Sequence, residues 1–169
     1  MRFLEKKEGI LMRILVISDS HKSSQTVEKI IEAQPTAEQI FFLGDVVGDI
    51  EDLQFLYPNK SFHIVSGNCD FGSLYKCEDT AFAADKKIFF AHGHTLGVKF
   101  GKRPLIEKAK ELGCDIALYG HTHCPDILYE DGIFVVNPGS CSSPRNYSKP
   151  TYAVIDIEKN GIKPIIIEV

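Results

Sequence analysis

Short apolar runs, each followed at once by residues that can bind a metal ion, constrain the fold more than any other feature of this sequence. The first three runs are typical of strands buried on both faces and span Arg13–Ile17, Ile40–Leu43 and Phe62–Val65. Helical patterns separate them: Val27, Ile30 and Ile31 form one apolar stripe, and Ile50–Leu56 suggests a short helix. This alternation predicts a mostly parallel sheet with helices outside, in which ligands bind beyond the carboxyl ends of the strands.

The second half of the chain is richer in strands. Lys76–Phe82 and Lys87–Ala91 are expected to form an antiparallel pair. A helix is expected to begin at Pro104 and end at Gly113, with an apolar stripe at Leu105, Ile106, Ala109 and Leu112. Further strands are predicted at Ile116–Tyr119, Ile127–Glu130, Ile133–Val136, Tyr152–Glu158 and Ile162–Val169. Two sheets packed face to face with helices outside would accommodate both halves of the chain.

The length of 169 residues fits one domain. We expect residues 1–11, which are charged and lack a period, to form a leader outside the fold, with Met12 the natural start and the domain covering residues 12–169. The 5 cysteines include no C-x-x-C pair, so we expect a reduced cytoplasmic protein. No apolar run approaches the ~20 residues of a membrane span, and a net charge of −4 gives no strong signal for nucleic-acid binding.

Two histidines stand one residue apart in Gly120-His121-Thr122-His123, directly after an apolar run. In extended backbone, residues i and i+2 point to the same side, so both rings would face one space. That arrangement suits two metal ions about 3.5–4 Å apart, with one histidine for each. Ordinary loop histidines are the alternative interpretation of this pair taken alone.

The rest of the chain supplies matching side chains just after other predicted strands. The candidate metal ligands are Asp19, His21, Asp45, Asn68, His92, His121 and His123. Carboxylate oxygen, amide oxygen and imidazole suit Mn, Fe, Zn, Co or Ni, and they suit two-ion sites that hold a phosphoryl group. Asp45 is the natural bridging ligand by its position, because a carboxylate has two oxygens.

The order of these motifs resembles that of the calcineurin-like metallophosphoesterases. The motifs are Asp19-x-His21, Gly44-Asp45, Gly67-Asn68-x-Asp70, His92-Gly93-His94 and Gly120-His121-x-His123. The short chain, Gly67-Asn68-Cys69-Asp70 and Asn137-Pro138-Gly139-Ser140 look like the small YfcE/MJ-type phosphodiesterase branch. The resemblance implies an α/β fold, specifically a four-layer α/β/β/α sandwich of two mixed sheets with outer helices.

The resemblance also implies two divalent transition-metal ions per chain, with manganese as the first choice and Fe, Ni, Co or Zn as alternatives. One ion would be held by Asp19, His21, Asp45 and His123, and the other by Asp45, Asn68, His92 and His121. His94 is not carried over as a ligand; we expect it beside the ligands or near the substrate. His63 is expected to be a core or rim histidine.

Two departures from the family pattern affect catalysis. Cys69 stands where many members have a histidine that protonates the leaving group, followed here by Asp70. A thiol is a weaker proton donor and carries no positive charge; Cys69 as a nucleophile is the alternative that we consider weaker. Lys22 replaces a common glycine and is either a cation at the mouth of the site or a solvated side chain. Arg145 is either a phosphate contact or a surface charge.

The expected function is hydrolysis of phosphodiesters by hydroxide held between two metal ions. A phosphomonoesterase acting on a nucleotide or sugar phosphate is one alternative, and a non-catalytic scaffold of the same fold, as in a retromer subunit, is another. A structural zinc protein is disfavoured because the cysteines lack paired spacing. The expected partner is a small phosphate ester, with homo-oligomerisation possible and no membrane association.

Overall fold

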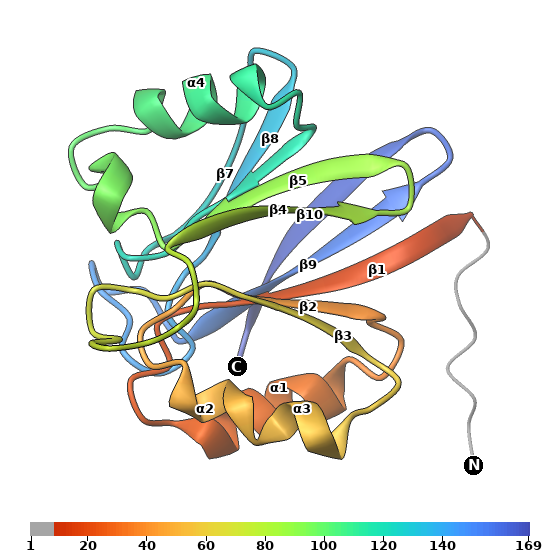
Figure 1. Cartoon of the computed structure of the whole chain (residues 1–169). Helices are drawn as coiled ribbons and strands as arrows, with labels where there is room; N and C mark the ends of the chain where they lie inside the picture. Colours follow the sequence, from red (N-terminus) through yellow and green to blue (C-terminus); the bar gives the residue numbers. More distant parts are fainter. Residues whose placement is uncertain (1–8) are drawn as a thin grey trace.

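The apolar runs near the N-terminus form the centre of the first sheet in the computed structural model, which describes residues 9–169 (Figure 1). The strands of this sheet are β1 (Ile10–Ile17), β2 (Gln39–Phe42), β3 (Ser61–Ile64), β9 (Thr151–Glu158) and β10 (Gly161–Glu168). Their order is β10-β9-β1-β2-β3. β1 pairs in parallel with β2, and β2 with β3, as the strand–helix alternation predicts. β9 is antiparallel to both of its neighbours.

The second sheet is also mixed. Its strands are β4 (Glu78–Ala83), β5 (Lys86–Ala91), β6 (Ile116–Leu118), β7 (Pro125–Glu130) and β8 (Ile133–Pro138). Their order is β4-β5-β6-β8-β7. The predicted antiparallel pair β4 and β5 is confirmed, and β5, β6 and β8 run parallel.

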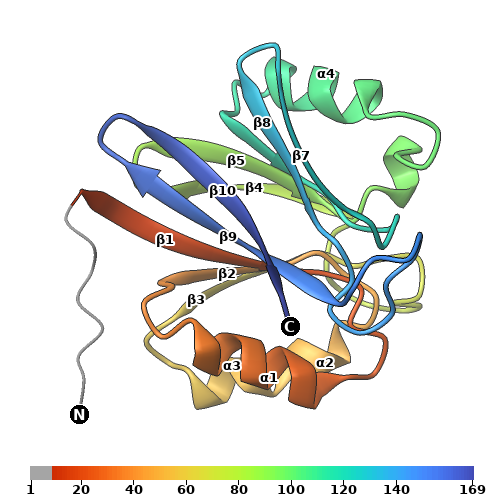
Figure 2. The same ribbon diagram turned by 180° about the vertical axis from the view of Figure 1, so that it is seen from behind.

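Helices cover the outer faces of the stacked sheets. Three of them, α1 (Ser24–Ala33), α2 (Gly48–Glu51) and α3 (Leu53–Leu56), lie on the first sheet, and α4 (Arg103–Glu111) lies on the second (Figures 1 and 2). Alternation along β1 explains the layering: Ile14 and Val16 pack between the sheets, while Leu15 and Ile17 pack toward α1. A third cluster fills the space between the second sheet and α4. The predicted four-layer sandwich is thereby confirmed.

The helices match their sequence patterns with two differences. The predicted stripe of α1 is buried, but the single helix expected over Ile50–Leu56 is two separate four-residue helices. Helix α4 ends at Glu111, and Leu112 is 38% exposed, so Leu112 lies outside the buried stripe. Gly113, with a φ of 67°, stops the helix in the left-handed conformation that favours glycine.

The first strand is longer than its apolar run predicts. β1 begins at Ile10, which pairs with Glu158 of β9, so Ile10 and Leu11 belong to the sheet rather than to a leader. Residues 1–8 of the predicted leader lie outside the described residues. Within residues 9–169, no helix combines the length and apolar character that a membrane crossing requires.

Candidate metal centre

The predicted ligands lie on loops at the carboxyl ends of strands from both sheets. The first sheet supplies Asp19, His21, Asp45 and Asn68, and the second supplies His92, His121 and His123. Main-chain bonds hold neighbouring loops together: the Asp19 amide donates to the Gly44 carbonyl (3.0 Å), and the Gly120 amide donates to the His92 carbonyl (3.0 Å). The His121 amide donates to Asp19 Oδ2 (3.1 Å), which joins the two sheets at the site.

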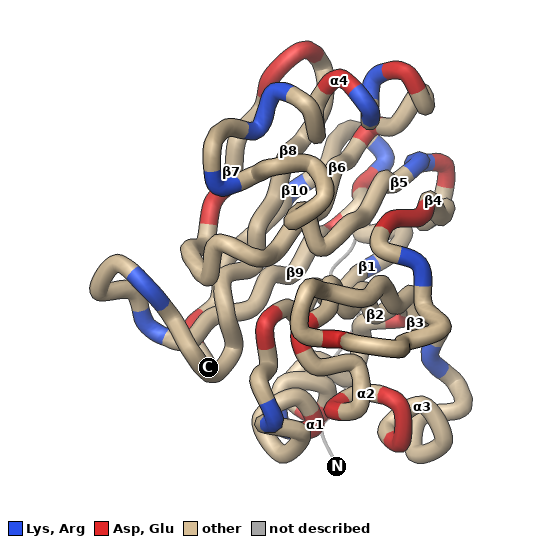
Figure 3. Tube along the Cα trace, turned by 60° about the vertical axis from the view of Figure 1, so that its left-hand side comes forward, with Lys and Arg blue, Asp and Glu red and all other residues tan. Residues whose placement is uncertain are grey.

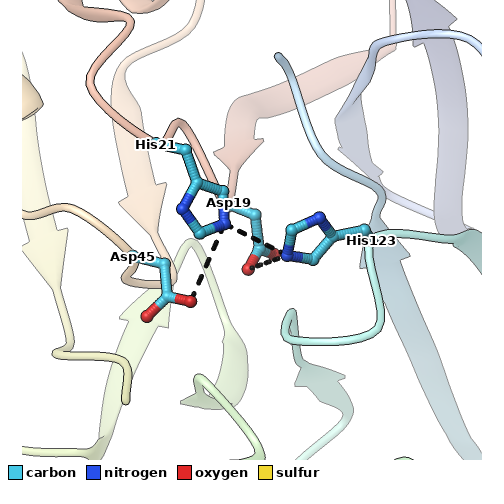
Figure 4. A group of neighbouring side chains, drawn as sticks. All are labelled: Asp19, His21, Asp45 and His123. Carbon is cyan, nitrogen blue, oxygen red and sulfur yellow. Dashed lines mark hydrogen bonds and ion pairs between the residues drawn. The ribbon is translucent and has the colours of Figure 1, made fainter. Parts of the chain in front are cut away.

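One group of four side chains meets as the resemblance implies (Figure 4). The ligand atoms of Asp19, His21, Asp45 and His123 all lie within 4.8 Å of one another. His123 Nε2 is 3.2 Å from Asp19 Oδ1 and 3.1 Å from His21 Nε2. His21 Nε2 is 3.8 Å from Asp45 Oδ2. These atoms face a common point and could hold one divalent ion.

The remaining ligands gather around His92. His92 Nε2 lies 3.1 Å from Asn68 Oδ1 and 3.2 Å from His121 Nδ1. The same nitrogen is 3.5 Å from Asp45 Oδ2. Asp45 Oδ2 is therefore close to a histidine nitrogen of each group, which is the position that the bridging role requires.

The hydrogen bonds around these groups leave their lone pairs without a donor. The Leu43 carbonyl accepts from His92 Nδ1 (2.7 Å), and the Ser143 carbonyl accepts from His123 Nδ1 (2.6 Å), because a carbonyl can only accept. The Nε2 atoms of neutral rings then point lone pairs into the site. Asp19 Oδ1 is buried there, 3.2 Å from His123 Nε2, and has no hydrogen-bond donor among the described residues while that ring is neutral. Converging acceptors in a buried site need a cation, so the donor set fits divalent metal ions.

The pKa shifts of His121 and His123 agree with a site whose acceptors face a cation. Burial, together with electrostatic interactions with the neighbouring His92 and Lys99, lowers the pKa of His121 to about 4, so the His121 ring is neutral at pH 7. The hydrogen bond with Asp19 raises the pKa of His123. A proton on His123 and a metal ion would each place positive charge beside Asp19, so the two would compete for this position.

The backbone at the ligands differs from the prediction. Both histidines of the 121–123 pair have positive φ (67° and 59°), and so do Asp19 (55°), His21 (44°) and Asp45 (50°). The expectation of extended backbone with both rings on one side is therefore wrong. Left-handed turns direct His121 toward His92 and His123 toward Asp19 instead. Asp and His are among the non-glycine residues that adopt this conformation most often.

Two motif glycines are required by close packing. A Cβ at Gly67 would lie 2.0 Å from Asp45 Oδ1, and a Cβ at Gly120 would lie 2.1 Å from Ser18 Oγ. Side chains at these positions would displace the bridging carboxylate or the residue that donates to Asp19 Oδ2. The glycines before Asn68 and His121 therefore let the loops approach closely enough to form the site.

Asp70 and Cys69 lie directly against Asp45. The Asp70 carboxylate accepts from the amides of Asp45 (2.9 Å), Gly67 (2.7 Å) and Val47 (2.8 Å). The Cys69 amide donates to Asp45 Oδ1 (2.9 Å), while Asp45 Oδ2 faces His21 and His92. Partial desolvation and the charges of Asp45, Asp70 and Asp19 raise the pKa of the Cys69 thiol, so it remains protonated at neutral pH.

The other singled-out residues have distinct surroundings. The His94 ring lies 5.3 Å from the His92 ring and 6.1 Å from the His121 ring, beside the ligands. The Arg145 amide donates to the His123 carbonyl, and its side chain is exposed near the site. His63 stacks on Phe41 and hydrogen-bonds Gln39, as expected of a core or rim histidine. The Lys22 side chain is exposed.

Some contributors have no signal in the sequence. The Leu43 and Ser143 carbonyls fix ring tautomers through main-chain atoms, which any residue type could supply. The hydroxyl of Ser140 donates to the Asp19 carbonyl (2.7 Å) and holds the turn before His21. Ser140 is part of the Asn-Pro-Gly-Ser motif that was noted only as a mark of the family.

Comparisons with known proteins agree with this site. Residues 12–160 match the family model of the calcineurin-like phosphoesterase superfamily domain. The probable metallophosphoesterase YsnB of Bacillus subtilis is 33% identical over 154 residues, covering 89% of this chain and 87% of YsnB. Phosphodiesterase YfcE of Escherichia coli is 30% identical over 169 residues, covering 86% of this chain and 88% of YfcE.

A solved structure supports the same assignment. The crystal structure of a predicted phosphoesterase from Streptococcus pneumoniae TIGR4 has a TM-score of 0.81 and 30% identity, covering 93% of this chain and 89% of that chain. The geometry of the candidate ligands, the family model and the structural similarity all support the same family. This chain therefore belongs to the calcineurin-like phosphoesterase superfamily, a family of metal-dependent phosphoester hydrolases.

Proposed function

We propose that this protein is a phosphodiesterase that uses two divalent metal ions. The observation that carries the proposal is the position of Asp45 Oδ2, 3.8 Å from His21 Nε2 and 3.5 Å from His92 Nε2. One oxygen between two sets of imidazole and oxygen donors is the arrangement that a pair of ions shares. The side chains of all seven predicted ligands lie close together in two adjoining groups, which favours an enzyme over a scaffold of the same fold.

The side chains would have distinct roles in such a site. Two divalent ions bound at this site would lower the pKa of a coordinated water and would neutralise charge on the phosphate. One ion would be held by Asp19, His21 and His123, and the other by His92, His121 and Asn68. Asp45 would bind both ions. The amide of Cys69 and the carboxylate of Asp70 fix Asp45 in its bridging orientation. Arg145 would contact a non-bridging phosphate oxygen from the exposed side.

The surroundings of Cys69 favour diesters over monoesters. A monoester carries an extra negative charge and usually a poor leaving group, so it benefits most from a cationic proton donor. Cys69 is neutral and protonated at pH 7, and the carboxylates of Asp45 and Asp70 lie next to it. The thiol could donate a hydrogen bond to a departing oxygen but adds no positive charge. The name of the relative YfcE, a phosphodiesterase, supports the same preference.

The metal and the compartment belong to the same proposal. Oxygen and imidazole donors without thiolate favour manganese, with Fe, Ni, Co or Zn as alternatives. All five cysteines, including Cys69 beside the site, are free, which supports a reducing cytoplasmic location. The substrate is expected to be a small phosphate ester that reaches the exposed side of Asn68 and Arg145.

The test is hydrolysis by purified protein that has been stripped of metal and reloaded with Mn²⁺, Fe²⁺, Ni²⁺, Co²⁺ or Zn²⁺ in turn. The substrates are a diester and a monoester with the same leaving group. We expect two ions per chain, Mn²⁺-dependent turnover and a higher kcat/KM for the diester. His92→Gln should abolish turnover, whereas His63→Gln, a matched change outside the site, should retain it. Full activity without bound metal would refute the proposal.

A further inference from the structure

A cavity of about 530 Å³ borders the metal centre on the side of Asp45. Its walls come from the loop after β2 and the loop after β3, and they include Val46, Val47, Cys69, Phe71 and Tyr75. The volume falls in the ~300–1,000 Å³ range of small-molecule sites. Nothing in the two-metal arrangement described above uses this space.

The cavity is connected to the metal ligands through short contacts. Cys69, which lines the cavity, donates its amide hydrogen to Asp45 Oδ1 (2.9 Å). The same carboxylate presents Oδ2 to His92 Nε2 at 3.5 Å. Asp70, another lining residue, accepts from the amides of Asp45 and Val47. A group bonded to a phosphate at the metals could therefore extend directly into the cavity.

The lining also restricts the chemistry of that group. Phe71 is 94% exposed and Leu74 fully exposed at the rim, so these side chains present apolar surface to any occupant. No Lys or Arg is among the lining residues, and the exposed residue Glu51 contributes a carboxylate. Acidic stretches of the chain, drawn in red, lie at α2 (Figure 3). Apolar and aromatic side chains, together with the two carboxylates of Asp70 and Glu51, favour an uncharged aromatic occupant and disfavour an anion.

A second cavity of about 450 Å³ has the opposite character. It is lined by three basic residues, Lys99, Lys102 and Arg103, by one acidic residue, Glu130, and by Phe100, which is 98% exposed. Anionic groups would be better accommodated there. Because the two cavities differ in charge, replacing one aromatic residue in each tests on which side the leaving group lies.

We propose that the cavity beside Cys69 receives the leaving alcohol of the substrate and selects an uncharged aromatic alcohol, such as a nucleoside, over an anionic one. This inference rests on the proposed phosphodiesterase activity. In the reaction, the water oxygen bonds to phosphorus, the ester P–O bond breaks with its electron pair on the departing oxygen, and that oxygen takes up a proton. The neutral alcohol then leaves through the apolar rim.

The experiment uses the full-length, Mn²⁺-loaded protein and three diesters. Two are methyl aryl phosphates whose phenols have matched acidity, one phenol neutral and one carrying an anionic sulfonate. The third is methyl trifluoroethyl phosphate, which has a small leaving group. Steady-state kinetics are measured on the wild type and on Phe71→Ser, Glu51→Lys and Phe100→Ser. The control is Phe55→Ser, because Phe55 lines neither cavity; all four changes are at exposed residues.

The wild type should favour the neutral aryl ester over the sulfonated one at least tenfold in kcat/KM. Phe71→Ser should lower kcat/KM for the neutral aryl ester about tenfold, a change of about 1.4 kcal/mol, mainly through KM. It should leave the trifluoroethyl ester within twofold. Glu51→Lys should reduce the preference for the neutral ester about tenfold, and Phe55→Ser should change nothing.

Two results would overturn the inference while leaving the proposed function intact. One is a wild type that prefers the anionic leaving group. The other is a Phe100→Ser variant that loses aryl-ester turnover while the Phe71→Ser variant keeps it. If no ester is hydrolysed at all, the proposed function fails, and the cavity is tested directly by saturation-transfer NMR with thymidine. Binding that Phe71→Ser weakens at least threefold would support the cavity as an aromatic site, and absence of binding would refute it.

Discussion

At the scale of single residues, the metal ligands combine strained backbone with buried acceptors. Asp19, Asp45 and His123 have positive φ and are at most 5% exposed. Each non-glycine residue in this conformation costs on the order of 1–3 kcal/mol, and the buried lone pairs add electrostatic repulsion. Metal binding would offset both the backbone strain and the repulsion between the lone pairs. Substitutions at these positions should therefore change metal content before they change the fold.

Asp45→Ala should reduce the content of both metals, because Asp45 Oδ2 lies near a histidine nitrogen of each group. His123→Ala should mainly weaken the one ion beside Asp19. Metal stoichiometry by native mass spectrometry distinguishes the two variants. Retention of two ions in Asp45→Ala would show that the bridging role is misassigned.

Cys69→Ser should keep turnover within about tenfold of wild type, or ~1.4 kcal/mol in the barrier, because the raised pKa of the Cys69 thiol makes it a poor nucleophile. Cys69→His should raise monoester turnover relative to diester turnover, since an imidazolium adds charge and a proton. Both Asp70 oxygens already accept backbone amides, so the new ring depends on its own packing for orientation.

The measurement is steady-state kinetics on one diester and one monoester with the same leaving group, at equal metal occupancy. Complete loss of activity in Cys69→Ser with both metals bound would contradict the water-attack mechanism and make Cys69 the nucleophile.

At the scale of elements, strands fix where the loops start, and the loops decide where the ligands point. β6 ends at Leu118, and His121 and His123 then diverge to different partners through left-handed turns. The left-handed backbone conformation can also end a helix. Gly113, for example, ends α4 with a φ of 67° and no atom near the place of a Cβ.

Gly113→Ala should therefore destabilise the fold by about 1 kcal/mol through backbone strain alone. Gly161→Ala, where a Cβ also meets nothing within 4 Å and φ is not left-handed, is the matched control. Thermal unfolding should show Gly113→Ala about 2–4 °C below the control. Equal melting temperatures would mean that the helix end relaxes without strain.

At the scale of the whole molecule, the metal centre joins the two sheets. The first sheet contributes Asp19 and Asp45, the second His92 and His123, and the contacts between them include the 3.2 Å approach of His123 to Asp19. Ions held by ligands from both sheets would resist their separation. Global stability should therefore depend on metal concentration.

Chelation should abolish hydrolysis and lower the melting temperature. An ion at about 100 times its Kd contributes ~2.7 kcal/mol, which corresponds to roughly 5–10 °C for a chain of this size. Calorimetry with and without Mn²⁺ gives the shift, and Asp45→Ala is the control that should show little. An identical melting temperature for the wild type in both conditions would argue against a centre that bridges the sheets.

The sequence by itself predicted most of the elements and the candidate ligands. Periodicity marks buried strands and helix stripes such as Val27, Ile30 and Ile31, because burial of apolar surface follows local geometry. The placement of Asp45 and Asn68 after parallel strands predicts that they share one edge of a sheet, because parallel strands end together.

Only the tertiary structure decided how those ligands meet. The left-handed turns at His121 and His123, the Leu43 and Ser143 carbonyls and the close approach of Gly67 to Asp45 depend on contacts between segments far apart in the chain. The cavity lined by Val46 and Phe71 likewise arises from two loops that meet only in the fold. Local pattern carries little information about such contacts, because every residue type has a main-chain carbonyl and because the packing of a loop depends on segments far away in the sequence.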